Sequence, residues 1–207
     1  MDSNIDISYP ILEHIHNYNI CVEKREIYLH GFLGSEEHDP GVDYRMASMF
    51  LKNINLLSSL SDEPIFIYMN SIGGNWNSGM VIYDAIKMCN ANLETNIVVY
   101  GQAESMSSII MQAAKNRYIT KNSYFMCHYG SFSISSNLLD AQNAIRQERK
   151  FTETMINIYA EKAFNSKAFE GKSITHVKNF IKRKMKDGDW YLDPQECIDH
   201  GFADYII

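Results

Sequence analysis

The sequence predicts an α/β protein, and three observations lead to this prediction. Short runs rich in Ile, Val, Tyr and Phe, each closed by turn-forming residues, are typical of buried strands. Windows between them repeat apolar residues every three or four positions, as one face of a helix does. Strand and helix alternate along the chain, which is the pattern of parallel βαβ units. The length of 207 residues suits a single domain.

The first two thirds of the chain carry the alternating elements. Five strands are predicted, at Glu26–Gly31, Pro64–Asn70, Asn96–Gly101, Tyr118–Thr120 and Tyr124–His128. Three helices are predicted between them, at Tyr44–Leu60, Ser78–Asn90 and Ser107–Lys115. Each strand but the last two is thus followed by a helix, or by a turn into one, before the next strand begins.

The remaining third is predominantly helical. Apolar residues recur at helical spacing across Asn137–Ala163, a window without Gly or Pro, which predicts one long helix of about 40 Å. A second helix is predicted at Thr175–Lys186. It carries five basic residues, which we interpret as a solvated face with cations near the helix C-terminus; a docking patch is the alternative.

Composition and charge narrow the classes of partner and compartment. The formal net charge is −6 and the pI is near 5.6, whereas nucleic acids and anionic membranes attract basic surfaces. No apolar stretch approaches the ~18 residues of a membrane span, and the first residues lack the basic start of a secretory signal. Four widely spaced cysteines form no Cys-x-x-Cys motif: Cys21, Cys89, Cys127 and Cys197. We expect a cytoplasmic protein that binds neither nucleic acid nor membrane.

A pair of glycines, Gly73 and Gly74, follows the predicted strand Pro64–Asn70. Paired glycines let the backbone approach a ligand closely and leave N–H groups that can meet an anion or a developing oxyanion. An ordinary tight turn explains the same pattern, and by itself this segment favours the turn.

Ser105 stands where the predicted strand Asn96–Gly101 passes through a small-residue turn into a helix. The first turn of a helix has free N–H groups and the positive end of the dipole, so a serine there can serve as a nucleophile. The alternative is a helix N-cap, the usual role of such a serine. Ser107 and Ser108 lie inside the helix, where their hydroxyls can bond to carbonyl groups instead.

His128 ends the predicted strand Tyr124–His128, two positions before a glycine. The other six histidines stand in polar contexts, and only His128 follows a β pattern into a turn. A histidine at a strand end that faces a strand-to-helix junction is well placed to act as a general base. A buried structural histidine is the alternative.

Four segments of the chain together resemble the Clp protease proteolytic subunit family, serine peptidases of the crotonase-like fold. The family pattern N-S-P-G-G…G-M…Y-D resembles Asn70–Gly74 with Gly79, Met80, Tyr83 and Asp84. Its G-Q-A-A-S-M motif resembles Gly101–Met106, and its strand P-N-S-R-V-M-I-H resembles Lys121–His128. Its closing pattern D-x-F-L-S-A-x-E-A-x-x-Y-G-L-x-D resembles Asp189–Asp204. The four segments stand in the family's order between residues 23 and 207.

The resemblance implies a set of site residues. Ser105 would be the nucleophile, His128 the general base and then acid, and Asp189 the carboxylate that orients the imidazole. Asp187 is the rival for the third role, since spacing alone does not separate the two carboxylates.

The resemblance also implies an oxyanion hole and a substrate-binding turn. Backbone N–H groups of Gly74 and Met106 would form the hole, and Ile72 and Gly73 would contact the substrate. No metal site is implied. Ile72 stands where the family usually has proline, and Ser107 replaces a small residue after the Ser-Met pair.

The fold implied by the resemblance is a crotonase-like superhelix of ββα units with a long protruding handle helix. We expect an N-terminal segment at 1–22 and one protease domain at 23–207, with the handle at about 129–164. Peptide-bond hydrolysis would proceed through an acyl-enzyme, without ATP, metal or bound cofactor. The implied partners are unfolded protein or peptide substrates, further copies in a heptameric ring, single or double, and an AAA+ unfoldase.

Three alternatives to general proteolysis stay open at this point. One is a dedicated processing protease of the kind that matures viral capsids. A second is a ring subunit without catalytic activity that assembles with an active relative, although such subunits typically lose a triad residue. The third is a crotonase-type acyl-CoA enzyme, which shares the Gly-Gly turn but does not require Ser105 and His128.

Overall fold

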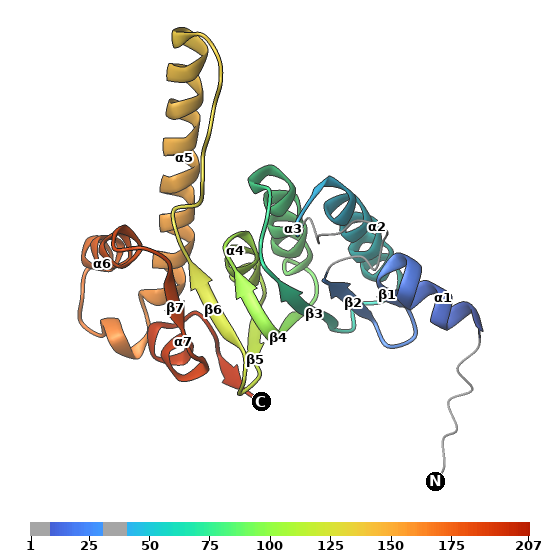
Figure 1. Cartoon of the computed structure of the whole chain (residues 1–207). Helices are drawn as coiled ribbons and strands as arrows, with labels where there is room; N and C mark the ends of the chain where they lie inside the picture. Colours follow the sequence, from blue (N-terminus) through green and yellow to red (C-terminus); the bar gives the residue numbers. More distant parts are fainter. Residues whose placement is uncertain (1–8, 31–40) are drawn as a thin grey trace.

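A computed structural model describes residues 9–30 and 41–207 of the chain, and these form a mixed α/β body from which one helix projects (Figure 1). Eight strands make one sheet in the order β1-β2-β3-β4-β5-β8, with β6 pairing β4 and β7 pairing β6. The strands are β1 Ile20–Cys21, β2 Glu26–Leu29, β3 Ile65–Ser71, β4 Thr95–Glu104, β5 Asn116–Ile119, β6 Tyr124–Cys127, β7 Trp190–Leu192 and β8 Tyr205–Ile206. The predicted fold class is confirmed.

Helices α2, α3 and α4 lie on one side of this sheet, whereas α6 and α7 lie in the C-terminal part, near β6 and β7 (Figure 1). They are α1 Tyr9–Tyr18, α2 Tyr44–Leu60, α3 Trp76–Cys89, α4 Met106–Met111, α5 Leu138–Ala163, α6 Ile174–Lys186 and α7 Pro194–His200, with a short 3₁₀ turn at Lys167–Phe169. The predicted N-terminal segment 1–22 lies outside the described residues for its first eight positions, and α1 and β1 occupy most of the rest.

Parallel pairing of β2, β3 and β4 follows from the helical crossovers α2 and α3 between them. Residues of β3 alternate between the two faces, so that Ile65, Ile67 and Met69 are buried while Phe66 is exposed. Asp43 starts α2 by accepting a hydrogen bond from the Met46 N–H at 2.9 Å. Burial of these apolar side chains under α2 and α3 supplies the main driving force for this half of the body.

Strand β4 runs farther than its sequence predicts. The predicted strand ended at Gly101, but β4 continues to Glu104 and changes partner on the way. On one edge β3 pairs with both halves of β4, with Ser71 opposite Ala103. On the other edge the partner changes, because Asn96–Val99 pair with β5 and Gln102–Glu104 pair with Tyr124–Met126 of β6. Gly101 at φ 78° lets the backbone bend where the partner changes. The small residues that suggested a turn therefore serve a bend within one strand, and the strand delivers Ser105 to the start of α4.

Helix α4 is shorter than predicted: it begins at Met106 and ends at Met111, whereas the prediction ran to Lys115. The Gln112 side chain follows its last turn and donates to the carbonyl oxygens of Ser108 at 3.1 Å and Phe202 at 3.3 Å. The chain must then turn to enter β5, and the buried Ala113 and Ala114 leave room for that turn.

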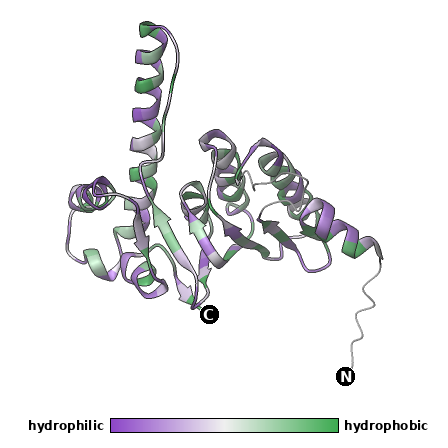
Figure 2. Cartoon of the chain, viewed as in Figure 1, coloured by the Kyte–Doolittle hydropathy of each residue, from purple (hydrophilic) through white to green (hydrophobic). Residues whose placement is uncertain are grey.

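Helix α5 confirms the predicted long helix, and it projects from the body (Figure 1). Asn137 caps it by accepting the Asp140 N–H at 3.0 Å. Only its last turns are buried, from Met155 onward. Hydrophobic and hydrophilic residues mix along its projecting turns (Figure 2). The second predicted helix is α6, in which Lys182, Arg183, Lys184 and Lys186 are exposed and Lys178 is half-buried.

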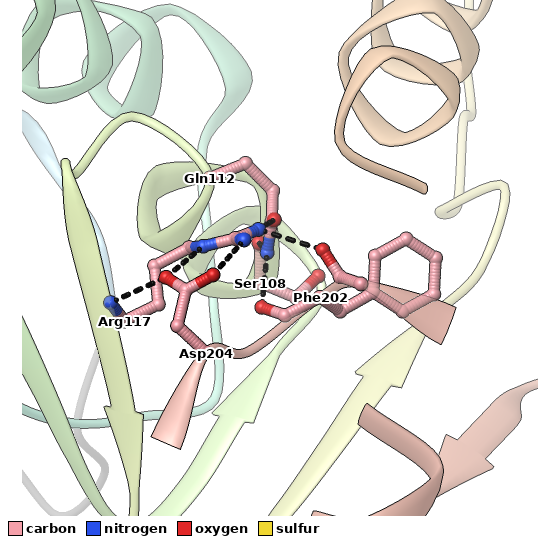
Figure 3. A network of polar contacts seen from close by, with 6 residues as sticks. Ser108, Gln112, Arg117, Phe202 and Asp204 are labelled. Carbon is pink, nitrogen blue, oxygen red and sulfur yellow. Dashed lines mark hydrogen bonds and ion pairs between the residues drawn. The ribbon is translucent and has the colours of Figure 1, made fainter. Parts of the chain in front are cut away.

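A buried arginine fastens the C-terminal segment to the centre of the fold (Figure 3). The Nε and Nη2 atoms of Arg117 lie 2.9 and 2.6 Å from the carboxylate oxygens of Asp204, and Nη1 donates to Gln112 Oε1 and Gly201 O. A buried guanidinium is stable only when its donors are satisfied in this way. The network links α4, β5 and the approach to β8.

Within the described residues, no helix combines the length and apolar character needed to cross a membrane.

Candidate active site

Ser105 lies between the end of β4 and the first residue of α4, at φ 50° and ψ −121°. This backbone conformation is uncommon for a residue with a side chain and costs on the order of 1–3 kcal/mol. Ser105 occupies the N-cap position of α4, but its side chain makes no capping hydrogen bond to the helix. The hydroxyl instead faces a cavity, as a serine nucleophile requires.

His128 follows β6 and lies beside Ser105, because β6 pairs with the last residues of β4. The Nε2 atom of His128 is 2.8 Å from the Ser105 Oγ atom. On the other side of the ring, Nδ1 is 3.2 Å from the Asp189 Oδ1 atom, at ion-pair distance. The two side chains differ in exposure, with 27% of His128 and 49% of Asp189 accessible to solvent. Asp187, the rival carboxylate, is the C-cap residue that follows the last residue of α6.

This row of three side chains fixes the preferred tautomer of the imidazole. A carboxylate can only accept, so we assign the proton of the neutral ring to Nδ1, beside Asp189. Nε2 of His128 is then free to accept the Ser105 hydroxyl proton across 2.8 Å. Such an arrangement can activate a hydroxyl for attack on a carbonyl carbon.

The Gly-Gly turn is held beside Ser105 by the segment around Val42. The Val42 N–H donates to Gly73 O at 2.7 Å, and the Asn75 N–H donates to Val42 O at 2.8 Å. In this parallel bridge Gly74 is the bridged residue, so its own N–H points away from Val42. The Met106 N–H is the first of α4, where no intrahelical partner exists. Neither N–H group has a hydrogen-bond partner among residues 9–30 and 41–207, so both can serve a ligand.

Only glycine fits at position 73. Its φ is 90°, and an added Cβ would lie 2.7 Å from the Ser105 Cβ and 2.8 Å from the Met106 nitrogen. These separations are shorter than any ordinary contact. The Gly-Gly turn and the start of α4 therefore pack backbone against backbone, which brings the N–H groups of Gly74 and Met106 to the same cavity.

Two buried hydroxyls connect the Gly-Gly turn to α4. Ser107 Oγ donates to Ser71 Oγ at 2.7 Å, and Ser71 Oγ accepts the Gly73 N–H at 3.3 Å. Ser107 is fully buried and Ser71 nearly so. Sequence patterns gave no signal for this link, because Ser71 and Ser107 belong to different elements.

A second pair of hydroxyls connects α5 to the nucleophile. Ser108 Oγ donates to the Ser105 carbonyl oxygen at 2.6 Å and is 2.6 Å from the Tyr159 hydroxyl. Burial raises the pKa of Tyr159 well above its usual range, so the phenol stays protonated and donates to Ser108. The backbone of Ser105 is also held on its other side, where its N–H donates to Met126 O. These bonds stabilise its unusual conformation.

The cavity in front of Ser105 has a volume of about 470 Å³. Its walls come from the Gly74 turn, the start of α4, the residues after His128 and one face of α5. Ile72 is exposed and Gly73 is buried, and neither contributes to the cavity wall, so their contact with substrate stays a prediction. Residues of α5 and Trp76 line the cavity although the sequence gave no reason to single them out.

Other groups near the site have different chemistry. Cys127 directly precedes His128, but burial raises the pKa of its thiol, so it does not supply a thiolate nucleophile. All four cysteines are buried and unpaired. Across residues 9–30 and 41–207, no three His, Cys, Asp or Glu side chains are grouped to hold a metal ion.

Comparisons with known proteins agree on one family. Residues 18–207 match the sequence profile of the family described as Clp protease. The chain is 28% identical over 169 residues to the ATP-dependent Clp protease proteolytic subunit 2 of Pseudomonas aeruginosa, covering 81% of this chain and 77% of that protein. It is 27% identical over 171 residues to the ATP-dependent Clp protease proteolytic subunit of Deinococcus radiodurans, covering 80% and 76%.

A solved structure is similar in fold. It is the ClpP1 N165D mutant from Listeria monocytogenes, with a TM-score of 0.71 and 23% sequence identity. The superposition covers 90% of this chain and 92% of that one. The crotonase-like architecture predicted from the sequence is thereby confirmed.

Proposed function

The chain belongs to the Clp protease family, and from that premise we propose that it is a serine endopeptidase whose catalytic residues are Ser105, His128 and Asp189. The proposal rests on one observation above all: His128 lies between the other two, with Nε2 at 2.8 Å from Ser105 Oγ and Nδ1 at 3.2 Å from Asp189. The three side chains come from separate parts of the sequence, and two of them, Ser105 and His128, line one cavity.

In the first half of the reaction, Ser105 Oγ attacks the carbonyl carbon of the peptide bond while its proton passes to His128 Nε2. The carbonyl oxygen becomes an oxyanion, which accepts hydrogen bonds from the N–H groups of Gly74 and Met106. Each such donor contributes on the order of 3 kcal/mol to transition-state stabilisation. His128 then gives the proton to the leaving amine, the C–N bond breaks, and an acyl-enzyme remains.

In the second half, water replaces the amine. His128 Nε2 takes a proton from water, the resulting hydroxide attacks the acyl carbon, and the proton returns to Ser105 Oγ as the ester bond breaks. Asp189 keeps the imidazole in the required tautomer and stabilises its cation throughout. Every bond change uses side chains of this chain and water.

Replacement of the nucleophile tests this proposal. Ser105→Ala is expected to abolish turnover of small fluorogenic peptides and covalent labelling by a fluorophosphonate, since both need the Oγ atom. Ser59→Ala, on the exposed side of α2, is the matched control and should keep both activities. Labelling that persists in Ser105→Ala would overturn the assignment.

We further propose that the protein acts as a ring of identical subunits, heptameric and either single or double, with α5 as part of the contact between copies. Leu138, Leu139 and Ile145 are exposed on the projecting part of α5, and exposed apolar residues on a projecting helix typically mark an interface. Native mass spectrometry of the purified chain tests the subunit number. Charge substitutions at Leu138 and Leu139 should lower it, and an unchanged mass distribution would contradict this contact.

Substrates and setting follow from the same family premise. We propose that unfolded proteins or peptides are cleaved in the cytoplasm, where the four unpaired cysteines would remain reduced, with an AAA+ unfoldase as a partner. Casein digestion with and without such an unfoldase and ATP tests the partnership. The named relatives are proteolytic subunits, so no observation favours an acyl-CoA enzyme.

A further inference from the structure

The cavity in front of Ser105 is lined by an acidic side chain and by no lysine or arginine of the described residues. Among its lining residues Glu148 is the one carboxylate, and neither Lys nor Arg lines it within the part of the chain that the structure describes. His128 also lines the cavity, and its proposed role as general base uses the uncharged imidazole. The cavity therefore presents a net negative charge to whatever side chain enters it.

Glu148 is placed toward the cavity by the geometry of α5. Phe151, Thr152 and Met155 lie three, four and seven residues after Glu148, so the four side chains share one face of the helix, and all four line the cavity. Glu148 is half-buried and forms no ion pair or hydrogen bond with residues 9–30 or 41–207. The neighbouring Arg149 and Lys150 are exposed and do not line the cavity. Glu148 thus has unused capacity to bind a cation.

The wall beside Glu148 is aromatic. Trp76, at the start of α3, stacks on Phe151 with ring centroids 5.0 Å apart and an interplanar angle of 23°. Both rings line the cavity. Flat aromatic surfaces pack well against the aliphatic stem of a long basic side chain, and a ring face also attracts the cationic head group. An aromatic wall with a carboxylate beside it therefore matches lysine and arginine better than leucine or glutamate.

The side of the cleaved bond follows from the oxyanion donors. The carbonyl oxygen that meets the N–H groups of Gly74 and Met106 belongs to the residue preceding the cleaved bond. Gly74 and Met106, which carry these donors, line the same cavity as Ile109 and Glu148. The side chain of the preceding residue, whose carbonyl is held at these donors, is therefore the one that we place in this cavity.

We propose that this cavity selects substrates with arginine or lysine immediately before the cleaved bond, through an ion pair with Glu148. The proposal rests on the proposed peptidase function of the same site. A charge-assisted pair in a partly enclosed cavity corresponds to a preference of about tenfold or more over an uncharged side chain.

Three peptide amides that differ only in the residue before a fluorogenic leaving group test the proposal: arginine, leucine and glutamate. With the full-length wild-type protein, kcat/KM should be at least about tenfold higher for arginine than for leucine, and lowest for glutamate. In Glu148→Gln the arginine-to-leucine ratio should fall about tenfold, mostly through KM, since ground-state binding is what the ion pair supplies. In Glu148→Arg the glutamate peptide should become the preferred substrate of the three.

Glu153→Gln is the matched control, because Glu153 lies on α5 but is exposed and does not line the cavity. Its arginine-to-leucine ratio should equal that of the wild type. A wild-type preference for leucine, or an arginine preference that persists in Glu148→Gln, would overturn the specificity proposal while leaving the peptidase proposal intact. Failure of both fluorophosphonate labelling and all peptide cleavage would instead overturn the peptidase proposal, and the specificity proposal with it.

Discussion

The two ends of the row Ser105, His128 and Asp189 are held in different ways. At the serine end, the backbone is fixed by buried hydroxyls and by close packing against Gly73. At the aspartate end, Asp189 is half-exposed and follows Gly188 after the exposed end of α6. One end therefore depends on core packing, and the other depends on an electrostatic contact near solvent.

This difference explains why substitutions at the two ends should have different effects on stability and activity. The serine end must hold an unfavourable backbone conformation, so it needs several satisfied bonds in a buried setting, where each one is hard to replace. The aspartate only orients the imidazole ring and stabilises its positive charge, and the surrounding solvent also stabilises that charge. We expect changes at the serine end to affect folding and activity together, and changes at the aspartate end to affect activity alone.

Among the changes that test this comparison, the largest effect is expected for Gly73→Ala. The added Cβ would overlap the Ser105 Cβ and the Met106 nitrogen, which forces apart the turn and the start of α4. Displacing oxyanion donors should lower kcat/KM by on the order of 10³-fold, with a lower Tm. Gly171→Ala is the matched control: its φ is also positive, at 70°, but no atom lies within 4 Å of the new Cβ. It should cost about 1 kcal/mol of stability and no activity. Equal effects of the two changes would contradict close packing at the serine end.

Asp189→Asn should have the next largest effect. The amide can present an N–H to Nδ1 and favour the wrong tautomer, so kcat should fall by on the order of 10²-fold, less than for a fully buried carboxylate. Asp187→Asn should retain near wild-type kcat. Thermal melting should be unchanged in both variants, because the two side chains are exposed. A larger loss in Asp187→Asn than in Asp189→Asn would reverse the assignment of the third residue.

A double-mutant cycle on Ser108 and Tyr159 measures how strongly α5 supports the nucleophile. Ser108→Ala leaves the buried Tyr159 hydroxyl without its partner and should cost about 1–3 kcal/mol of stability, with a several-fold loss of kcat. Tyr159→Phe should cost about 1 kcal/mol. The double variant should cost less than the sum, as measured by urea unfolding.

Thr154→Ala, on the exposed side of α5, is the control for that cycle and should change stability by less than about 0.5 kcal/mol. Strict additivity of Ser108→Ala and Tyr159→Phe would mean that the two hydroxyls do not act together.

The smallest effect is expected from salt. Raising the ionic strength from about 0.1 to about 1 M shortens the screening length to about 3 Å, which weakens the contact of His128 with the half-exposed Asp189. With a peptide that has leucine before the cleaved bond, kcat should fall about two- to threefold. The Asp189→Asn variant should show no such decline. Equal salt dependence in both proteins would place the effect elsewhere.

Much of this protein could be predicted from local patterns. The strands that carry Ile65–Met69 and Phe125–Cys127, the helix α5 and the strand-to-helix junction at Ser105 all follow from short-range periodicity and turn residues. Motif resemblance then proposed Ser105, His128, Asp189, Gly74 and Met106 for the site. Local patterns succeed here because each of these features depends on residue types at short spacing along the chain.

Other features were wrong or missing at that level. The prediction ended β4 at Gly101, since small residues look alike in a turn and in a bend where a strand changes partners. It also ran α4 to Lys115, because the bonds of Gln112 that close the helix involve Phe202, far along the chain. The roles of Ser71, Ser107 and Tyr159 had no local signal, because a hydroxyl pair is visible only once both partners are packed together.

The sequence by itself determined the class of fold, the order of its elements and the residues able to carry acyl-transfer chemistry, because these depend on residue type and short spacing. Only the tertiary structure decided which carboxylate lies at His128, which serines are buried, and that Glu148 lines the cavity from a distant helix. Those outcomes depend on contacts between segments far apart in the chain. Packing fixes such contacts, and no local pattern encodes them.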